Sequence, residues 1–331
     1  MELGQLPLQR NHDGQLQMAG CGPVTLQIHH NEIIGSGGQG TVYKGRICNI
    51  QGAPVLEVAL KVNQMPHDPH QQLRLEAELH AFASVNLPYV LRLLGFLAAH
   101  GPSETPALLV VEIGVPLAQL LVEVRAIGQM DMKELKSVAR IVYQLLRFIV
   151  AGDDMNFMHK DLKMDNIYAK HTHDLELVHL AIGDFGGAQK GQEKENGDVV
   201  YRAGVYTWHQ TSPRLAAEVY VGMATQGNPE DLELSRQLIL FNDLFGWARI
   251  AFKALTARAP PDIMYGPSPE DYASIPDLGH GAIVDAVHHL LSFALDLLTT
   301  GHIDEIVDSD YIKTLPWYHW LPQVLAGNPV G

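Results

Sequence analysis

The stretch His159-Lys160-Asp161-Leu162-Lys163-Met164-Asp165-Asn166 and the later tripeptide Asp184-Phe185-Gly186 decide how this chain is interpreted. Asp161 is a carboxylate that could orient an attacking hydroxyl group. Asn166 and Asp184 offer the oxygen ligands that Mg²⁺ prefers. Phosphoryl transfer needs such groups and little covalent help from the protein. A short His-x-Asp pattern is common by chance, but the full constellation in this order is not, so it predicts a phosphoryl-transfer site.

A glycine-rich segment upstream is the expected companion of such a site. Ile34-Gly35-Ser36-Gly37-Gly38-Gln39-Gly40-Thr41-Val42 has the spacing G-x-G-x-x-G-x-V, with Gly35, Gly37 and Gly40 in the glycine positions. Glycine lets the backbone turn tightly and approach phosphates without a Cβ in the way. A Rossmann-type protein uses the same three glycines, but there the turn opens a helix. Here β-forming residues flank the glycines at 25–28 and 41–43, which predicts strand-turn-strand.

The apolar segment Val58-Ala59-Leu60-Lys61-Val62 is a predicted strand that contains one lysine. A lysine in such a strand is costly to bury unless an anion lies beside it. The helix expected over residues 71–85 supplies two acidic candidates. We predict that Glu78 pairs with Lys61, and Glu76 is the alternative.

These motifs make the chain resemble the eukaryotic-type serine/threonine protein kinases over roughly residues 25–260. The resemblance implies an α+β, two-lobed fold with the nucleotide between the lobes. A small, mostly β lobe with one key helix would span residues 23–113. A larger, mostly α lobe would span residues 114–331, and residues 1–22 would form a poorly ordered leader.

The resemblance assigns roles to the polar residues. Lys61 would hold the α- and β-phosphates of ATP and pair with Glu78, whose distance from Pro88 is usual for the family. Asp161 would orient the acceptor hydroxyl, and Lys163 would neutralise the γ-phosphate. Mg²⁺, for which Mn²⁺ could substitute, would be bound by Asn166 and Asp184. The positions expected around ATP are Gly35, Gly37, Gly40, Val42, Ala59, Lys61, Val111, Glu112 and Ile113.

Two further features fit a kinase that acts on serine or threonine. Lys163 stands two residues after Asp161, and Thr211 stands seven residues before Glu218, where such kinases place a threonine that bridges the catalytic aspartate and lysine. The resemblance also predicts that Phe82, His159 and Phe185 belong to one regulatory stack of side chains. Asp243 would brace the catalytic loop.

Three departures mark the chain as divergent. Lys160 replaces an arginine and lacks its planar fork, which makes activation by phosphorylation less expected. Autophosphorylation of Tyr201, Tyr206, Thr207 or Ser212 stays open. Ala216-Ala217-Glu218 lacks the usual proline, and Thr225–Leu238 is expected to be an inserted surface element. Because every catalytic group is retained, an ATP-binding pseudokinase scaffold is a less favoured alternative. A small-molecule kinase of the antibiotic-phosphotransferase type is also less favoured, because such kinases generally lack counterparts of Glu218, Thr211 and Phe185.

Composition limits the partners and the location. The 331 residues carry a net charge of −14, which disfavours nucleic acid or an anionic membrane as a partner. Cys21 and Cys48 are the only cysteines, so we expect a reducing compartment, the cytoplasm, or a host cytosol if the protein is a secreted bacterial effector. Charged and polar residues interrupt the most apolar stretch, 107–124, so no membrane span is expected. The partner would be a protein substrate with a serine or threonine acceptor, and the oligomeric state stays open.

Hydrophobic periodicity completes the expected secondary structure. It predicts buried helices over residues 135–149, 239–255 and 282–298, and strands over 91–97 and 107–112. The aromatic segment 316–322 is expected to pack onto the large lobe. His171 and His173 are expected in a solvated loop rather than at a metal site.

Overall fold

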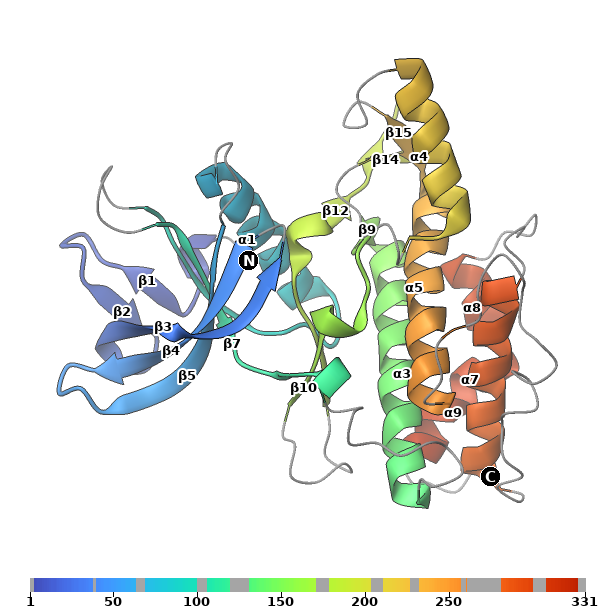
Figure 1. Cartoon of the computed structure of the whole chain (residues 1–331), viewed down its shortest axis with the longest axis horizontal. Coiled ribbons are helices and arrows are strands. Elements are labelled where there is room, and N and C mark those ends of the chain that lie inside the picture. Colours follow the sequence, from blue (N-terminus) through green and yellow to red (C-terminus); the bar gives the residue numbers. More distant parts are fainter. Residues whose placement is uncertain are drawn as a thin grey trace. The chain divides into compact units, whose positions relative to one another are not determined.

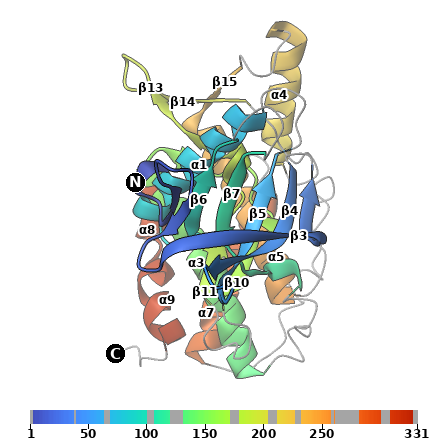
Figure 2. The same ribbon diagram turned by 90° about the vertical axis from the view of Figure 1, so that its left-hand side faces the viewer.

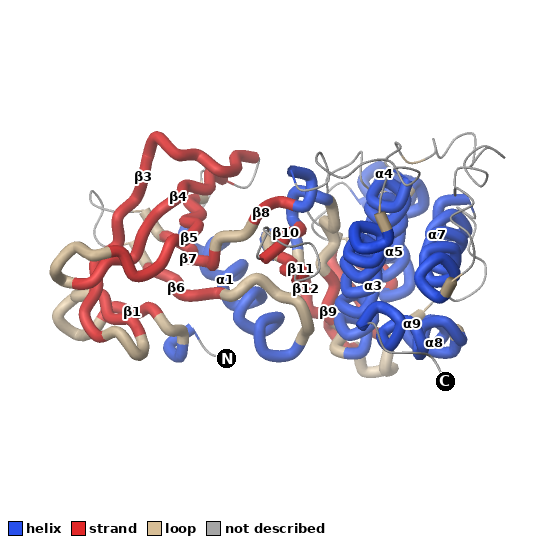
Figure 3. The backbone as a smooth tube through the Cα atoms, turned by 90° about the horizontal axis from the view of Figure 1, so that it is seen from below, coloured by secondary structure: helices blue, strands red, loops and turns tan. Residues whose placement is uncertain are grey.

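The structure is a computed structural model that describes residues 3–37, 40–63, 69–99, 106–119, 131–170, 179–203, 211–226, 232–256, 260, 281–299 and 308–326. The chain divides into two compact units, residues 1–114 with 183–186, and residues 115–182 with 187–331. The first unit is mostly strand and the second mostly helix (Figure 1, Figure 3). The chain therefore has the predicted α+β organisation. His171 and His173 lie outside the described residues.

A seven-stranded antiparallel sheet forms most of the first unit, in the order β1-β2-β3-β4-β5-β7-β6. Figure 2 shows the five strands from β3 to β6 side by side. Its strands are β1 (Leu8–Arg10), β2 (Leu16–Met18), β3 (Gly22–Gly37), β4 (Gly40–Asn49), β5 (Pro54–Val62), β6 (Leu93–Leu97) and β7 (Leu108–Glu112). The helix α1 (Pro69–Asn86) packs against β6 and β7. The core on one face of the sheet includes Ile47, Val58, Leu60 and Val110.

The glycine-rich segment lies where β3 and β4 meet. Gly35 is the cross-strand partner of Val42, and Gly37 is the partner of Gly40. Gly40 has a φ of 142°, and a Cβ there would lie 2.2 Å from the carbonyl oxygen of Val62, so no other residue fits. The two predicted strands that flank the glycines are therefore confirmed, and the segment that begins at Gly40 is a strand and not a helix.

The expectation of a poorly ordered leader over residues 1–22 is wrong for the part of it that is described. β1 pairs with β2, β2 pairs with β3, and β1 also packs against β6 at the other end of the sheet. Leu8 is 1% exposed and belongs to the core of the sheet. A Cβ on Gly95 of β6 would lie 2.7 Å from the Leu8 carbonyl oxygen, so the glycine permits this close approach. The short N-terminal strands thus complete the core of the first unit.

We predict that Leu8→Ala destabilises the first unit by about 2–4 kcal/mol, because it leaves a cavity in the core. Ile50→Ala is the matched control, since Ile50 is 65% exposed. The measurement is the free energy of opening of the β4 and β5 amides, from hydrogen exchange of the full chain. Equal losses in the two variants would show that Leu8 is not part of this core.

Three long helices form the core of the second unit: α3 (Met132–Asp154), α5 (Arg236–Thr256) and α7 (Ala282–Thr299). Each packs against the other two, as Figure 1 shows. They confirm the predicted helices over 135–149, 239–255 and 282–298. Asp131 begins α3 with a capping box: its side chain accepts from the Glu134 N–H, and the Glu134 side chain accepts from the Asp131 N–H.

The second unit also contains short strands and the helix α4. β8 (Val115–Pro116) and β11 (His179–Ile182) flank β10 (Ile167–Lys170), and β9 (Phe157–Met158) pairs with β12 (Gln189–Lys190). A third sheet contains β13 (Gln192–Glu193), β14 (Val199–Arg202) and β15 (Glu233–Ser235). α4 (Pro213–Gln226) lies between β14 and β15 in the sequence.

The predicted surface insertion Thr225–Leu238 is wrong in its described part. That part ends α4, forms β15 and begins α5. Leu232, Leu234 and Leu238 are buried, because β15 adds to the edge of β14 and packs against α5. The segment is therefore a structural element of the second unit and not a surface appendage.

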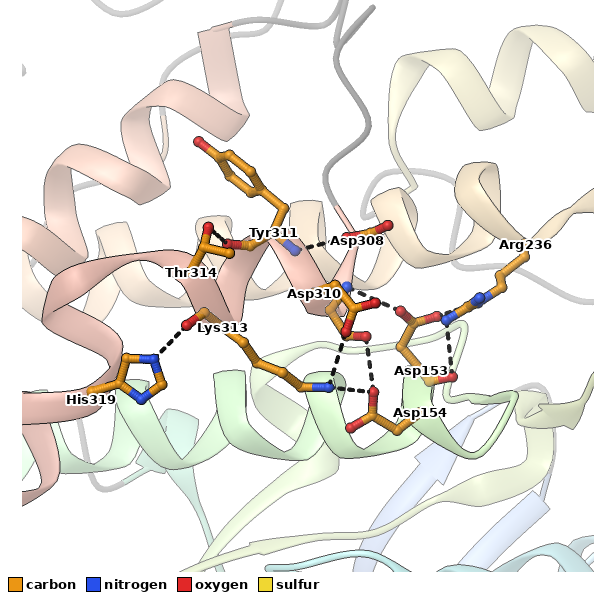
Figure 4. A network of polar contacts seen from close by, with 10 residues as sticks. Asp153, Asp154, Arg236, Asp308, Asp310, Tyr311, Lys313, Thr314 and His319 are labelled. Carbon is orange, nitrogen blue, oxygen red and sulfur yellow. Dashed lines mark hydrogen bonds and ion pairs between the residues drawn. The ribbon is translucent and has the colours of Figure 1, made fainter.

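The C-terminal helices α8 (Ser309–Thr314) and α9 (Pro316–Ala326) are attached to α3 by polar contacts (Figure 4). Asp154 accepts hydrogen bonds from the Ser309 hydroxyl at 2.9 Å and from the Lys313 ammonium at 2.6 Å. Asp153 pairs with Arg236 of α5 at 2.7 Å. Trp317 is 6% exposed, which confirms that the aromatic segment 316–322 packs onto this unit. None of the described helices has the length and apolarity that crossing a bilayer requires.

Candidate active site

One face of the sheet gathers several of the positions predicted to surround ATP. Val42 is the cross-strand partner of Lys61, and Ala59 is the partner of Val111. Cross-strand partners point to the same side of a sheet, as do residues two apart in a strand. Val42, Ala59, Lys61 and Val111 therefore share one face. Gly35 lies opposite Val42 on that face.

Glu112 and Ile113 were also predicted to surround ATP, but strand pairing does not place them on this face of the sheet. Glu112 is the partner of Val58 and so belongs to the opposite face of the sheet, and Ile113 follows the end of β7. Both are half-buried. A binding role for them would use the backbone of this segment, as the resemblance to kinases implies. That role stays a prediction.

Lys61 is held by two carboxylates of its own unit. Its ammonium nitrogen lies 2.8 Å from both carboxylate oxygens of Glu76 and 2.6 Å from Oδ1 of Asp184. Burial opposes the charged form of this lysine, but Glu76 and Asp184 outweigh that effect and raise the pKa of Lys61. Burial also opposes the charged form of Glu76 and raises its pKa, while the positive charge of Lys61 acts in the opposite direction. The result is a buried cation fixed between two anions.

The predicted pairing of Lys61 with Glu78 is wrong, and the alternative, Glu76, is the partner. Glu78 is 49% exposed on the outer face of α1 and pairs with Arg74 one turn earlier. The prediction that Phe82 belongs to the regulatory stack of side chains is shifted by two positions in the sequence, as the prediction of Glu78 is. His80 takes that place: its ring centroid lies 4.7 Å from that of Phe185, and Nε2 lies 2.5 Å from the Leu91 carbonyl oxygen. Both errors have one cause, the choice of the wrong face of α1.

We predict that Glu76→Ala lowers the free energy of unfolding of the first unit by about 3 kcal/mol, because it leaves a buried lysine with one partner. Glu78→Ala is the matched control and should change it by less than about 0.5 kcal/mol, since an exposed ion pair contributes little. Hydrogen exchange of α1 and β5 amides measures both. A larger effect of Glu78→Ala would restore the original assignment.

Residues 159–166, here called the catalytic loop, lie in the second unit and include the 3-10 turn η3 (Met164–Asn166). The Lys163 ammonium lies 2.6 Å from Oδ2 of Asp161. The Asn166 amide nitrogen donates to the Asp161 carbonyl oxygen at 2.8 Å and to Oδ2 at 3.3 Å. Within the described part of the chain, Oδ1 of Asp161 is buried and accepts no hydrogen bond. A carboxylate oxygen in this state is suited to accept a proton or a hydrogen bond from a hydroxyl group.

Asp243 of α5 holds the backbone just before Asp161. Its Oδ2 accepts the His159 N–H and its Oδ1 the Lys160 N–H, both at 2.8 Å. Lys160 has a φ of 67°, a strained conformation for a residue with a Cβ. Burial raises the pKa of Asp243 to about 7, although the two N–H donors lower it. Burial lowers the pKa of Lys160 to about 8, while Asp243 acts in the opposite direction.

Asn242 is a positioning residue that the sequence analysis did not single out. Its amide nitrogen donates to the Lys160 carbonyl oxygen at 3.3 Å, and its Oδ1 accepts the Ser212 N–H at 2.9 Å. It thereby links the catalytic loop to the segment that contains Thr211, which is 7% exposed. The signal in the sequence was the polar pair Asn242-Asp243 inside an otherwise apolar helix. The bridging role assigned to Thr211 stays a prediction, and Glu218 is exposed on α4.

Gly246 lets α5 approach the catalytic loop. A Cβ at this position would lie 2.8 Å from the Leu162 carbonyl oxygen and 3.2 Å from the Leu162 Cβ. We predict that Gly246→Ala destabilises the second unit by about 1–3 kcal/mol through overpacking. Gly281→Ala is the control, because no atom lies within 4 Å of its added Cβ. Tryptophan fluorescence during denaturant unfolding reports on this unit, and equal midpoints would contradict the close approach.

The residues predicted to bind a metal have suitable chemistry. Asn166 directs its amide nitrogen to Asp161, which leaves its amide oxygen as a ligand for a cation. Asp184 contributes a carboxylate, and oxygen ligands of these two kinds suit Mg²⁺. Metal binding by these two residues stays a prediction, and within the described residues no group of three or more His, Cys, Asp or Glu side chains could hold a metal ion.

Comparison with known proteins identifies the family. The model of the protein kinase domain matches residues 28–226, more than half of the 331 residues. The chain therefore belongs to the protein kinase family and has its two-lobed α+β fold. It is 27% identical over 297 residues to the serine/threonine-protein kinase pkn2 of Myxococcus xanthus, covering 88% of this chain and 31% of the relative.

Other relatives are named as serine/threonine-protein kinases or as tyrosine-protein kinases. The chain is 25% identical over 242 residues to the probable serine/threonine-protein kinase PBL20 of Arabidopsis thaliana, covering 71% of this chain and 54% of the relative. It is 27% identical over 171 residues to the tyrosine-protein kinase SYK of Gallus gallus, covering 52% and 25%. The chain thus spans about half or less of the length of each of these relatives.

Proposed function

We propose that the protein is an ATP- and Mg²⁺-dependent kinase that transfers the γ-phosphate of ATP to serine or threonine hydroxyls of a protein substrate. The observation that carries the proposal is the arrangement at Asp161. One of its carboxylate oxygens is paired with Lys163, and the other is buried and accepts no hydrogen bond within the described residues. A group in this state can orient the acceptor hydroxyl, while Lys163 supplies positive charge for the transferred phosphoryl group.

The residues of the first unit support nucleotide binding. The charged Lys61 is suited to the α- and β-phosphates, and Val42, Ala59 and Val111 offer an apolar surface for the adenine ring. Gly35, Gly37 and Gly40 would leave the backbone of β3 and β4 open to the phosphates. Mg²⁺ bound by Asn166 and Asp184 would neutralise charge on the phosphates.

The preference for serine and threonine rests on two positions and on the relatives. Lys163 lies beside Asp161, and Thr211 is buried next to Ser212, which Asn242 binds. Two of the relatives named above are described as serine/threonine-protein kinases and one as a tyrosine-protein kinase. The assignment of the acceptor therefore needs a direct test.

We predict that Asp161→Asn lowers the rate of phosphoryl transfer by about 10²–10⁴-fold, because it removes the carboxylate that orients the hydroxyl. Asp165→Asn is the matched control, since Asp165 lies in the same loop and is exposed. The assay follows labelled γ-phosphate from Mg-ATP to the protein itself, to mixed protein substrates and to small-molecule acceptors. Phosphoamino-acid analysis then identifies the acceptor residue.

Each outcome separates the proposal from its alternatives. Phosphoserine or phosphothreonine that Asp161→Asn abolishes and Asp165→Asn retains supports the proposal. Phosphotyrosine alone would overturn the acceptor assignment. Transfer only to small molecules would indicate a small-molecule kinase, and ATP binding without transfer in the wild type would indicate a pseudokinase scaffold.

A further inference from the structure

The last turn of α3 carries a buried ion pair that the proposed chemistry at Asp161 does not use. Asp153 is 0% exposed, and its Oδ1 accepts a hydrogen bond from Nε of Arg236 at 2.7 Å. Nη2 of Arg236 lies 3.4 Å from the carbonyl oxygen of the same aspartate. The second carboxylate oxygen, Oδ2, accepts the backbone N–H of Ser309 at 3.1 Å. Both carboxylate oxygens are therefore occupied, one by a cation of α5 and one by the start of α8, as Figure 4 shows.

The chain between this ion pair and the catalytic loop is short and closely packed. Asp153 lies eight residues before Asp161 in the sequence. Its carbonyl oxygen accepts the Asn156 N–H at 3.1 Å, where the chain leaves α3 and enters β9. A Cβ at Gly152 would lie 2.6 Å from the Phe157 carbonyl oxygen, so β9 begins directly against the last turn of α3. Because a closely packed interior transmits strain, a displacement of this turn would move the residues that follow it.

The helix α5 binds this part of the chain at two points. Arg236 is the first residue of α5 and holds Asp153 before the catalytic loop begins. Asp243 stands seven residues later and accepts two backbone N–H groups of the catalytic loop. Residues seven apart in a helix lie on the same face, about 10 Å apart along the axis. One face of one helix therefore fixes the chain on both sides of residues 154–158.

The geometry of the ion pair suits a positioning role better than a stabilising one. A buried ion pair often adds little to stability, because removing both charges from water offsets their attraction. α3 and α5 also pack against each other, and the Trp247 indole N–H donates to the Val142 carbonyl oxygen between them. Arg236 adds direction to this packing, because its planar group binds a side-chain oxygen and the main-chain oxygen of Asp153 together.

We propose that Asp153 and Arg236 are positioning residues for phosphoryl transfer, whose ion pair fixes the end of α3 to α5 and thereby sets the place of the Asp161 carboxylate. The proposal rests on the kinase function proposed above. The Ser309 N–H completes the contact, so the C-terminal helix α8 contributes to the same support.

The first test is hydrogen exchange of the full chain, which does not depend on activity. Asp153→Asn removes the negative charge at nearly unchanged volume, so the exchange rates of peptides covering residues 156–162 should rise by about tenfold or more. Arg236→Gln should produce the same local rise. Asp154→Asn is the matched control and should leave these peptides unchanged, because Asp154 is the neighbouring carboxylate, is exposed and binds α8.

The α7 amides serve as the internal reference for this experiment. A rise in exchange that is confined to residues 156–162 supports the proposal, because the ion pair then acts on the chain that leads to Asp161. Unchanged exchange over these residues in both test variants would overturn it. An equal rise in α7 would overturn it as well, since the pair would then only stabilise the whole unit.

The kinetic constants distinguish positioning from nucleotide binding. Asp153→Asn and Arg236→Gln should each lower kcat by about tenfold, while the KM for ATP changes by less than about twofold. Asp154→Asn should retain kcat within about twofold of the wild type. A loss confined to KM, or an equal loss of kcat in the control variant, would contradict the positioning role.

A double variant tests whether the two residues act as one unit. Asp153→Asn combined with Arg236→Gln should lower kcat by about the same tenfold as either change alone, whereas independent effects would multiply to about a hundredfold. Multiplied effects would overturn the proposal. If the wild type transfers no phosphate at all, the proposed function fails, whereas the exchange experiment still decides whether the ion pair holds the chain before the catalytic loop.

Discussion

The second unit depends on the hydrogen bonds that the buried carboxylate of Asp243 accepts from the backbone of the catalytic loop. This carboxylate accepts the N–H groups of His159 and Lys160, and so it maintains the left-handed backbone of Lys160 immediately before Asp161. Burying a carboxylate is unfavourable, which its raised pKa of about 7 reflects. The arrangement persists because α5 is itself held firmly. The Trp247 indole N–H donates to the Val142 carbonyl oxygen at 2.8 Å.

A second buried carboxylate, that of Glu76 in α1, explains why the predicted pairing of Lys61 with Glu78 was wrong. In the sequence of α1, Leu75, Leu79, Phe82 and Ala83 lie at helical spacing, and this pattern predicts that they form the buried face. The buried residues of α1 are Leu73, Ala77, Ala81 and Ala83, together with the polar Glu76 and His80. Leu75 is 56% exposed. Glu76 is buried because it pairs with Lys61 of the sheet, and the sequence of the helix alone does not contain that partner.

Local chemistry was predictable and distant contacts were not. The glycine positions, the three long helices and the groups around Asp161 follow from motifs and periodicity within short segments. β1 and β15 do not, because each is three residues long and each also contacts a strand far away in the sequence: β1 packs against β6, and β15 pairs with β14. Gly95 permits the close approach of Leu8, a relation that links positions on two distant strands. The role of Asn242 was only partly predictable. The polar pair in α5 was visible in the sequence, but the partners of Asn242, the Lys160 carbonyl oxygen and the Ser212 N–H, lie in two separate segments.

Lys160 shows how one substitution changes meaning once its partners are known. In the sequence it counted as a loss, because a lysine lacks the planar fork that grips a phosphate with two parallel hydrogen bonds. In the structure its ammonium group donates to the Arg202 carbonyl oxygen and to Oε1 of Gln189, and a compact ammonium group makes such hydrogen bonds without a fork. The buried site lowers the pKa of Lys160 to about 8, so the charge is retained at neutral pH. Lys160 therefore connects the loop before Asp161 to β12 and to the end of β14.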